Sequence, residues 1–158
     1  GGGGGGTGPG PAGGSQTGEG SAGEPASATM TVTSVHDGDT LYLDPGTGDD
    51  LKVRLIGIDT PEIGENAECF GAEARDRTRA LLPEGTVVTV VAEAGPLDQY
   101  GRALLHVYLA DGTHVNRVLI DEGFAWAMFF DPNRAFEGEF KDAERAAEAA
   151  GVGLWGSC

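Results

Sequence analysis

After residue 30 the chain contains five short segments with the pattern of β-strands, and their order restricts the fold more than any other feature. Each segment alternates apolar and polar residues or is rich in β-branched residues. Clusters of glycine, aspartate and proline separate several of them. The predicted strands are residues 30–35, 40–43, 51–58, 86–94 and 103–109.

Three further segments show the apolar periodicity of amphipathic helices. Residues 69–82 form the first, between the third and fourth strands, and residues 113–123 form the second. The third is the clearest, because its apolar residues recur at helical spacing: Phe136, Phe140, Ala143 and Ala147. This order predicts an α+β fold, a five-stranded Greek-key β-barrel of the oligonucleotide-binding (OB) type with three α-helices.

The first 30 residues differ in composition from the rest of the chain. They hold 13 of the 28 glycines and no aromatic residue. Such a segment cannot bury enough apolar surface to offset the entropy that ordering costs. We therefore predict a disordered Gly/Ser/Pro-rich linker over residues 1–30 and one domain over residues 31–158.

The chain is acidic, with 25 Asp and Glu against 10 Lys and Arg and a net charge of -15. This balance argues against strong non-specific binding to polyanions, so any nucleic-acid contact must depend on a local group of bases. No apolar run approaches the roughly 18 residues that span a bilayer, so we expect no membrane span. We expect an extracellular or surface-tethered domain whose signal segment is absent from this chain.

The two cysteines, Cys69 and Cys158, allow two interpretations. In a reducing compartment they would be free thiols. In an exported domain they would close a loop of about 90 residues, which stabilises a fold by at most about 4 to 5 kcal/mol. We favour the disulfide, because a cysteine at the last residue has little packing role.

Three charged motifs stand out: DGDT at 37–40, RLIGIDTPE at 54–62 and DQYGR at 98–102. Taken singly, each is compatible with an ordinary turn or loop. Together with FGAEA at 70–74 and a terminal GLW, in this order and spacing, they resemble the staphylococcal nuclease (thermonuclease) family. The resemblance covers nearly all of residues 31–156.

The resemblance implies a bound calcium ion, Ca2+, held by Asp39, Asp59 and the main-chain carbonyl of Thr60. Oxygen ligands from side chains, backbone and water suit this cation. The resemblance also implies that Glu62 positions or deprotonates the attacking water, and that Arg54 and Arg102 bind the phosphate. The planar fork of arginine can hold two phosphate oxygens at once.

Two departures from the family pattern concern substrate binding. Gln99 stands where members of the family often have a lysine, although Tyr100 beside it is kept. MFFD replaces the tyrosine-containing stretch that lines the base pocket. Phe129 and Phe130 can still stack on bases, so we expect Tyr100, Phe129 and Phe130 to bind substrate.

The resemblance therefore implies a monomeric, calcium-dependent endonuclease, a hydrolase that cleaves phosphodiester bonds of DNA and RNA. We expect it to prefer single strands and to leave 3′-phosphate ends. The alternative is a catalytically inactive OB-fold module that binds oligonucleotides or another partner, which the acidic charge and Gln99 favour. A third interpretation is an exported adhesion or scaffold module. We expect His36, His106 and His114 to be structural or exposed, because their spacing is not that of metal ligands.

Overall fold

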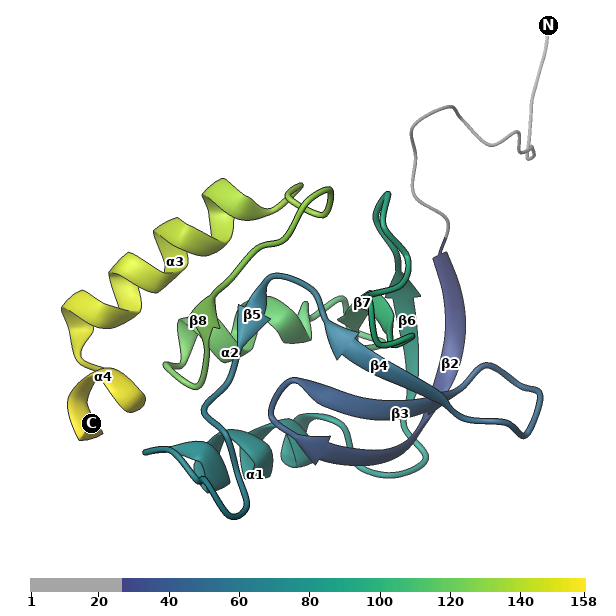
Figure 1. Ribbon diagram of the computed structural model, residues 1–158, viewed down its shortest axis with the longest axis horizontal. Coiled ribbons are helices and arrows are strands. Elements are labelled where there is room, and N and C mark those ends of the chain that lie inside the picture. The colour runs from purple at the N-terminus through teal and green to yellow at the C-terminus, as the bar shows by residue number, and fades with distance from the viewer. Residues whose placement is uncertain (1–26) are drawn as a thin grey trace, which may run out of the picture.

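The computed structural model describes residues 27–158, in which five strands form a closed barrel (Figure 1). Around the barrel the strands follow the order β2–β3–β4–β7–β6. All neighbouring pairs are antiparallel except β4 and β7, which run parallel. This arrangement confirms the predicted α+β fold with an OB-type barrel. The strands are β2 (Ser27–Asp37), β3 (Thr40–Asp44), β4 (Leu51–Leu55), β6 (Val87–Val91) and β7 (Ala103–Tyr108).

The first strand begins earlier than expected. β2 starts at Ser27, which pairs with Val91 of β6, and Met30 pairs with Val88. Residues 27–30 therefore belong to the barrel and not to the linker, a correction to the boundary at residue 30. The small side chains of Ser27, Ala28 and Thr29 gave no strand pattern, and the pairing of these residues to β6 is long-range. The rest of the predicted linker, residues 1–26, lies outside the described residues.

The third predicted strand is divided in two at Gly57. Barrel strand β4 ends at Leu55, and a separate strand β5 (Ile58–Asp59) pairs with β8 (Trp126–Ala127). Gly57 has φ 82°, and a Cβ atom there would lie 2.8 Å from the ring of Phe140. Glycine is therefore required both for the backbone conformation and for the approach of the helix that carries Phe140. The bend takes β5 out of the barrel sheet and into its pairing with β8.

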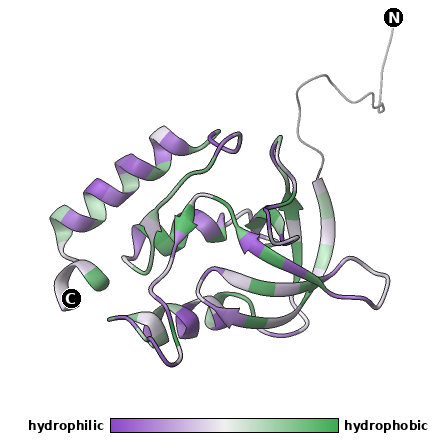
Figure 2. Cartoon of the chain, in the orientation of Figure 1, coloured by the Kyte–Doolittle hydropathy of each residue, from purple (hydrophilic) through white to green (hydrophobic). Residues whose placement is uncertain are grey.

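The three predicted helices are present, and a fourth short helix follows them. Their bounds are α1 (Gly71–Leu81), α2 (Val115–Asp121), α3 (Glu137–Ala150) and α4 (Leu154–Ser157). α3 contacts β8, and Figure 1 shows α3 and α4 on the opposite side of the β5–β8 pair from the barrel. Hydrophilic and hydrophobic residues alternate along α3 in Figure 2, and its apolar face is buried through Phe140, Ala143 and Ala147.

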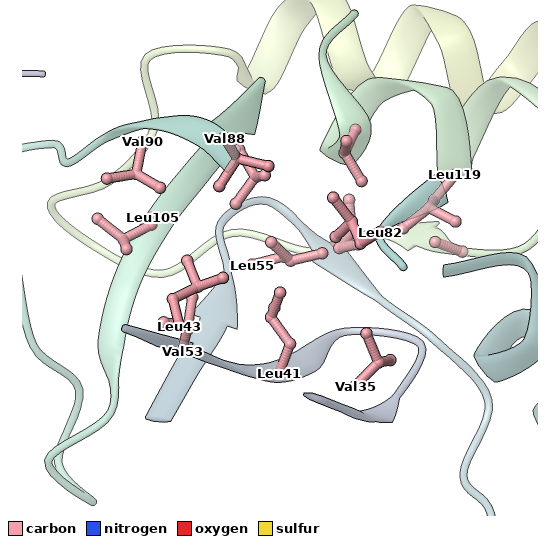
Figure 3. Close-up of a cluster of buried hydrophobic side chains, with 14 of the residues drawn as sticks. Val35, Leu41, Leu43, Val53, Leu55, Leu82, Val88, Val90, Leu105 and Leu119 are labelled. Atoms are coloured by element: carbon pink, nitrogen blue, oxygen red, sulfur yellow. The ribbon is translucent and has the colours of Figure 1, made fainter. Parts of the chain in front are cut away.

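The main core fills the barrel and continues under the helices. In Figure 3 Leu41, Val53 and Leu55 from the barrel belong to the same cluster as Leu82, which follows α1, and Leu119 of α2. Each of these five side chains is at most 1% exposed. The barrel and the helices therefore share one apolar interior, so a change at the end of a strand is transmitted to the helix packed against it.

A disulfide joins the two cysteines, with an S–S distance of 2.07 Å between Cys69 and Cys158. It connects the segment before α1 to the end of α4, as favoured from the sequence. None of the helices in residues 27–158 is long and apolar enough to cross a membrane.

Candidate active site

Arg54 of β4 lies at the centre of the charged motifs. Its Nη2 atom is 3.3 Å from Oδ2 of Asp39 and 3.7 Å from Oδ1 of Asp59. Its Nη1 atom donates hydrogen bonds to the carbonyls of Leu55 and Ile58, at 2.9 and 2.7 Å. These carbonyls flank the bend at Gly57, so the division of the strand both orients the arginine and brings Asp59 to it.

Asp39 is held in the turn between β2 and β3, where it is 5% exposed. Its Oδ2 accepts the main-chain N–H of Thr60 at 3.0 Å, and its Oδ1 accepts the hydroxyl of Thr40 at 3.1 Å. The Asp37 carboxylate accepts the main-chain N–H of Asp39 at 3.2 Å and so supports the turn. Burial, followed by its hydrogen bond and repulsion with Asp39, raises the pKa of Asp37 to about 6.

Asp59 lies in a site that is short of positive charge. Burial and then the negative charge of Asp39 raise the pKa of Asp59, although Arg54 acts in the opposite direction. One guanidinium nitrogen is thus shared by two carboxylates. The hydroxyl of Thr60 is buried beside them, and no described residue hydrogen-bonds to it. Unsatisfied buried polar atoms are uncommon and indicate a missing ion or water.

These donors fit a calcium ion. Within residues 27–158 no group of three or more His, Cys, Asp or Glu side chains is placed to hold a metal. A cation here would therefore rely on the carboxylates of Asp39 and Asp59 together with backbone and water oxygens. Calcium accepts that mixture of oxygen ligands, whereas zinc prefers nitrogen and sulfur.

Arg102 is fixed by Asp98, its neighbour in the loop between β6 and β7. Its Nε atom lies 2.7 Å from Oδ2 of Asp98, while Oδ1 accepts the main-chain N–H groups of Tyr100 and Arg102, both at 2.9 Å. Burial raises the pKa of Asp98, but these hydrogen bonds outweigh it and lower the pKa. The carboxylate binds the Nε edge of the guanidinium, which leaves the two Nη atoms to face other groups.

A cleft of about 390 Å³ brings Arg54 and Arg102 together. Its other lining residues include Leu97, Tyr100, Met128 and Phe130. Met128 and Phe130 belong to the MFFD stretch at 128–131, which was expected to line the base pocket, and Phe130 is 67% exposed. The cleft therefore combines two guanidiniums with apolar and aromatic surface.

Phe129 does not line this cleft. Its ring centroid lies 5.9 Å from that of Phe140, against the main core. Neighbouring residues in an extended segment point to opposite sides, so only one of the two phenylalanines can face the cleft. Met128 and Phe130 take that side, and sequence reasoning missed Met128.

Glu62 follows β5 at the edge of the site. It is exposed, and it does not line the cleft. Its main-chain N–H donates to the Glu68 carboxylate at 2.8 Å, and its carbonyl accepts the main-chain N–H of Glu68 at 2.9 Å. Its charge contributes to the raised pKa of Asp59, which places the carboxylate within electrostatic range of the candidate metal ligands.

Two buried asparagines that the sequence did not single out hold this site together. The Asn133 amide exchanges hydrogen bonds of 2.8 Å with the N–H and the carbonyl of Gly95, joining the two walls of the cleft. The Asn116 amide donates to the carbonyl of Ile56 at 2.9 Å and accepts the N–H of Val107 at 3.0 Å. For Asn116 the signal in the sequence is a polar residue within the apolar pattern of α2.

Comparison with known proteins is consistent with this geometry. Residues 52–157 match the family model described as staphylococcal nuclease homologue. The chain belongs to this family. The thermonuclease of Staphylococcus intermedius is 35% identical over 127 residues, covering 78% of this chain and 74% of that protein. The thermonuclease of Staphylococcus hyicus is 32% identical over 130 residues, covering 80% and 75%.

Other relatives are much longer proteins. Endonuclease YhcR of Bacillus subtilis is 32% identical over 134 residues, which cover 78% of this chain but only 11% of that protein. The matched region of the family therefore occurs both as most of a protein and as a small part of one.

Proposed function

We propose that this protein is a calcium-dependent endonuclease that hydrolyses phosphodiester bonds of DNA and RNA and leaves 3′-phosphate ends. The observation that carries the proposal is the position of Arg54, which contacts Asp39 and Asp59 and shares a cleft with Arg102. Membership of the family supports the reaction class, because relatives are named thermonuclease, endonuclease and micrococcal nuclease.

Asp39 and Asp59 would hold calcium through their carboxylates, and Thr60 through its main-chain carbonyl. When bound, calcium supplies positive charge beside the phosphate and coordination positions for water. Arg54 and Arg102 bind the phosphate oxygens and stabilise the negative charge that develops on them. Glu62 accepts a hydrogen bond or a proton from the attacking water.

Cleavage assays with a chelator test this proposal. Single-stranded DNA and RNA are incubated at mildly alkaline pH with calcium or with excess chelator, and we expect cleavage only with calcium. Products should be extended by a polymerase only after phosphatase treatment, because their ends carry 3′-phosphates. Arg102→Ala should lower kcat by about 10²- to 10³-fold. Arg145→Ala on exposed α3 is the matched control and should retain activity. Cleavage that ignores the chelator, or no cleavage, contradicts the proposal.

A second candidate is an inactive module that binds oligonucleotides or another partner. The exposed position of Glu62, outside the cleft lining, is the observation that favours it. Under this alternative, oligonucleotide binding would be unchanged by Glu62→Ala and the parent protein would not cleave. Under the proposed function, the same variant loses cleavage while it still binds.

We also propose that the protein acts as a monomer outside the cell, with single strands as its preferred substrates. The Cys69–Cys158 disulfide supports this location, because such bonds persist in oxidising compartments. Aromatic and apolar surface in the cleft supports the substrate preference, because unpaired bases can stack on it.

A further inference from the structure

Nearly all the positive charge of the protein is engaged by its own acids. All ten Lys and Arg residues lie within the described part of the chain. Two of the ten form no ion pair among the described residues. Arg79 donates hydrogen bonds to the carbonyl of Val35, and Lys52 on β4 is exposed. The eight that form ion pairs are Arg54, Arg75, Arg77, Arg102, Arg117, Arg134, Lys141 and Arg145.

Only two of these cations line the cleft, Arg54 and Arg102. The same cleft contains the carboxylates of Asp98 and Asp131. The rest of its lining is mostly apolar, and its other polar side chains, Tyr100, Asn133 and the exposed Gln99, carry no positive charge. Among the described residues no third basic side chain lines the cleft, and the exposed Lys52, two residues before Arg54 on β4, lies outside that lining.

Beyond the cleft the protein repels a polyanion. The chain carries a net charge of -15, and only Glu19 and Glu24 lie outside the described residues, so the described part carries -13. Nucleic-acid binding normally gains its strength and its salt dependence from the number of phosphates that cations neutralise. Within the cleft only Arg54 and Arg102 can neutralise phosphates, so the cleft provides for at most two of them.

We infer that this protein recognises a short single-stranded segment, one or two phosphates and the bases beside them, and gains nothing from longer or double-stranded nucleic acid. The inference rests on the proposed function and narrows its substrate class to short or flexible strands and strand ends. Two consequences follow for the purified protein. Its efficiency is nearly independent of substrate length, and it depends only weakly on salt.

The first experiment measures kcat/KM per scissile bond at saturating calcium for single strands of about 4 to about 40 nucleotides, and for duplex. We expect a change of less than about threefold across the single strands, and lower values for the duplex. A steady rise with length of more than about threefold would overturn the inference, because it would show contacts along the strand.

The second experiment measures kcat/KM against sodium chloride concentration. With two phosphates neutralised on a single strand, the double-logarithmic slope is no steeper than about -1.4, a loss of about sevenfold between 50 and 200 mM. A slope steeper than about -2 would require further cationic contacts and would overturn the inference.

A matched pair of variants tests whether KM and the salt dependence respond to positive charge in the cleft and not to positive charge elsewhere. Gln99→Lys adds one positive charge at an exposed residue of the cleft. Ala149→Lys adds the same charge on the exposed face of α3, outside the cleft lining. Gln99→Lys should lower KM and steepen the slope by about 0.7, whereas Ala149→Lys should leave both unchanged. Equal effects of the two variants would indicate a general charge effect and would contradict short-segment recognition.

Failure of the inference can be separated from failure of the proposed function. If no substrate is cleaved, the proposed function fails, and the same length and salt series is then measured as binding of fluorescent oligonucleotides. If substrates are cleaved with a steep salt slope or strong length dependence, the proposed function stands and the inference fails.

Discussion

At the scale of single residues, the carboxylates of Asp39 and Asp59 share one guanidinium nitrogen of Arg54. Folding therefore holds two negative charges close together with one positive charge to compensate them, and burial together with this excess raises the pKa of Asp59. A divalent cation would remove the imbalance. The stability of the protein should consequently respond to calcium even in the absence of substrate.

We predict that calcium raises the melting temperature and that Asp59→Asn abolishes the rise. At a calcium concentration 100-fold above the dissociation constant, the gain is about 2.7 kcal/mol, or about 10 °C. Without calcium, Asp59→Asn should melt at the same or a higher temperature than the parent, because the neutral amide relieves repulsion with Asp39. Differential scanning calorimetry with and without calcium measures both effects.

The control for this prediction is Asp49→Asn, which makes the same chemical change in the exposed turn between β3 and β4. It should keep the full calcium response. If Asp59→Asn responds to calcium as the parent does, Asp59 is not a ligand, and the assignment of the metal site is wrong.

At the scale of elements, a chain of hydrogen bonds connects the segment after β6, strand β7 and the residue that precedes α2. The Glu93 carboxylate lies 2.6 Å from Nε2 of His106, and Nδ1 of His106 lies 3.0 Å from Nε2 of His114. Because an ionised carboxylate accepts, His106 donates from Nε2 and accepts at Nδ1, so His114 donates from Nε2. The other oxygen of Glu93 accepts the N–H of Ala135 at 3.1 Å, which ties the segment before α3 to the barrel.

This chain requires both histidines to be neutral. Burial lowers the pKa of His106 and lowers the pKa of His114 to about 3. The charges of Glu93 and Glu139 oppose the shift at His106, whereas His106 and Arg117 add to the shift at His114. A lowered histidine pKa means that the unfolded chain takes up protons before the folded protein does. The contribution to stability is therefore complete above about pH 6.5 and is lost as the pH falls toward the folded pKa values.

We predict that the free energy of unfolding decreases between about pH 6.5 and pH 4, by at most about 1.4 kcal/mol per pH unit for each histidine. The contribution of His114 is smaller than this limit, because solvent screens a partly exposed ring. In His114→Gln the slope should be shallower than in the parent. Urea denaturation at a series of pH values measures it. His36→Gln, on the exposed edge of β2, should keep the parent slope, and an identical slope in all three proteins would contradict the prediction.

The sequence predicted the elements and the charged residues better than the walls of the site. The resemblance of their motifs to those of the family singled out Arg54, Asp39 and Asp59 without coordinates, and the structure places the three in contact. Met128 and Asn133 could not be found in this way, because their roles depend on which side of an irregular segment faces the cleft. That choice is set by long-range packing of Phe129 against α3 and by hydrogen bonds to the loop between β6 and β7.

The same limit explains the two corrections to the fold. β2 begins at Ser27 because β6 is available to pair with it, which local composition does not reveal. The bend at Gly57 was hidden because Ile56 and Ile58 continue an apolar run on either side of it. In both places the partner that decides the structure is distant in the sequence.

At the scale of the whole molecule, the Cys69–Cys158 disulfide connects the entrance of α1 to the end of the chain, across a sequence separation of 89. Cross-linking positions this far apart restricts the unfolded chain strongly. The barrel strands and the cleft arginines lie between the two cysteines in the sequence or precede both, and neither cysteine contributes a side chain to the cleft. The disulfide therefore contributes to the stability of the fold and not to the arrangement of side chains in the candidate active site.

We predict that reduction, or the double substitution Cys69→Ser with Cys158→Ser, lowers the free energy of unfolding by about 2 to 4 kcal/mol. Chelator-sensitive activity at 25 °C should remain within about twofold of the parent, because the retained stability of a domain this size still keeps most molecules folded. Denaturant unfolding of the oxidised parent, the reduced parent and the double variant measures the loss, and the variant itself should not respond to reductant. If reduction removes activity while the barrel stays folded by circular dichroism, the α1 and α4 region shapes the active site directly, and the separation between stability and catalysis argued above is wrong.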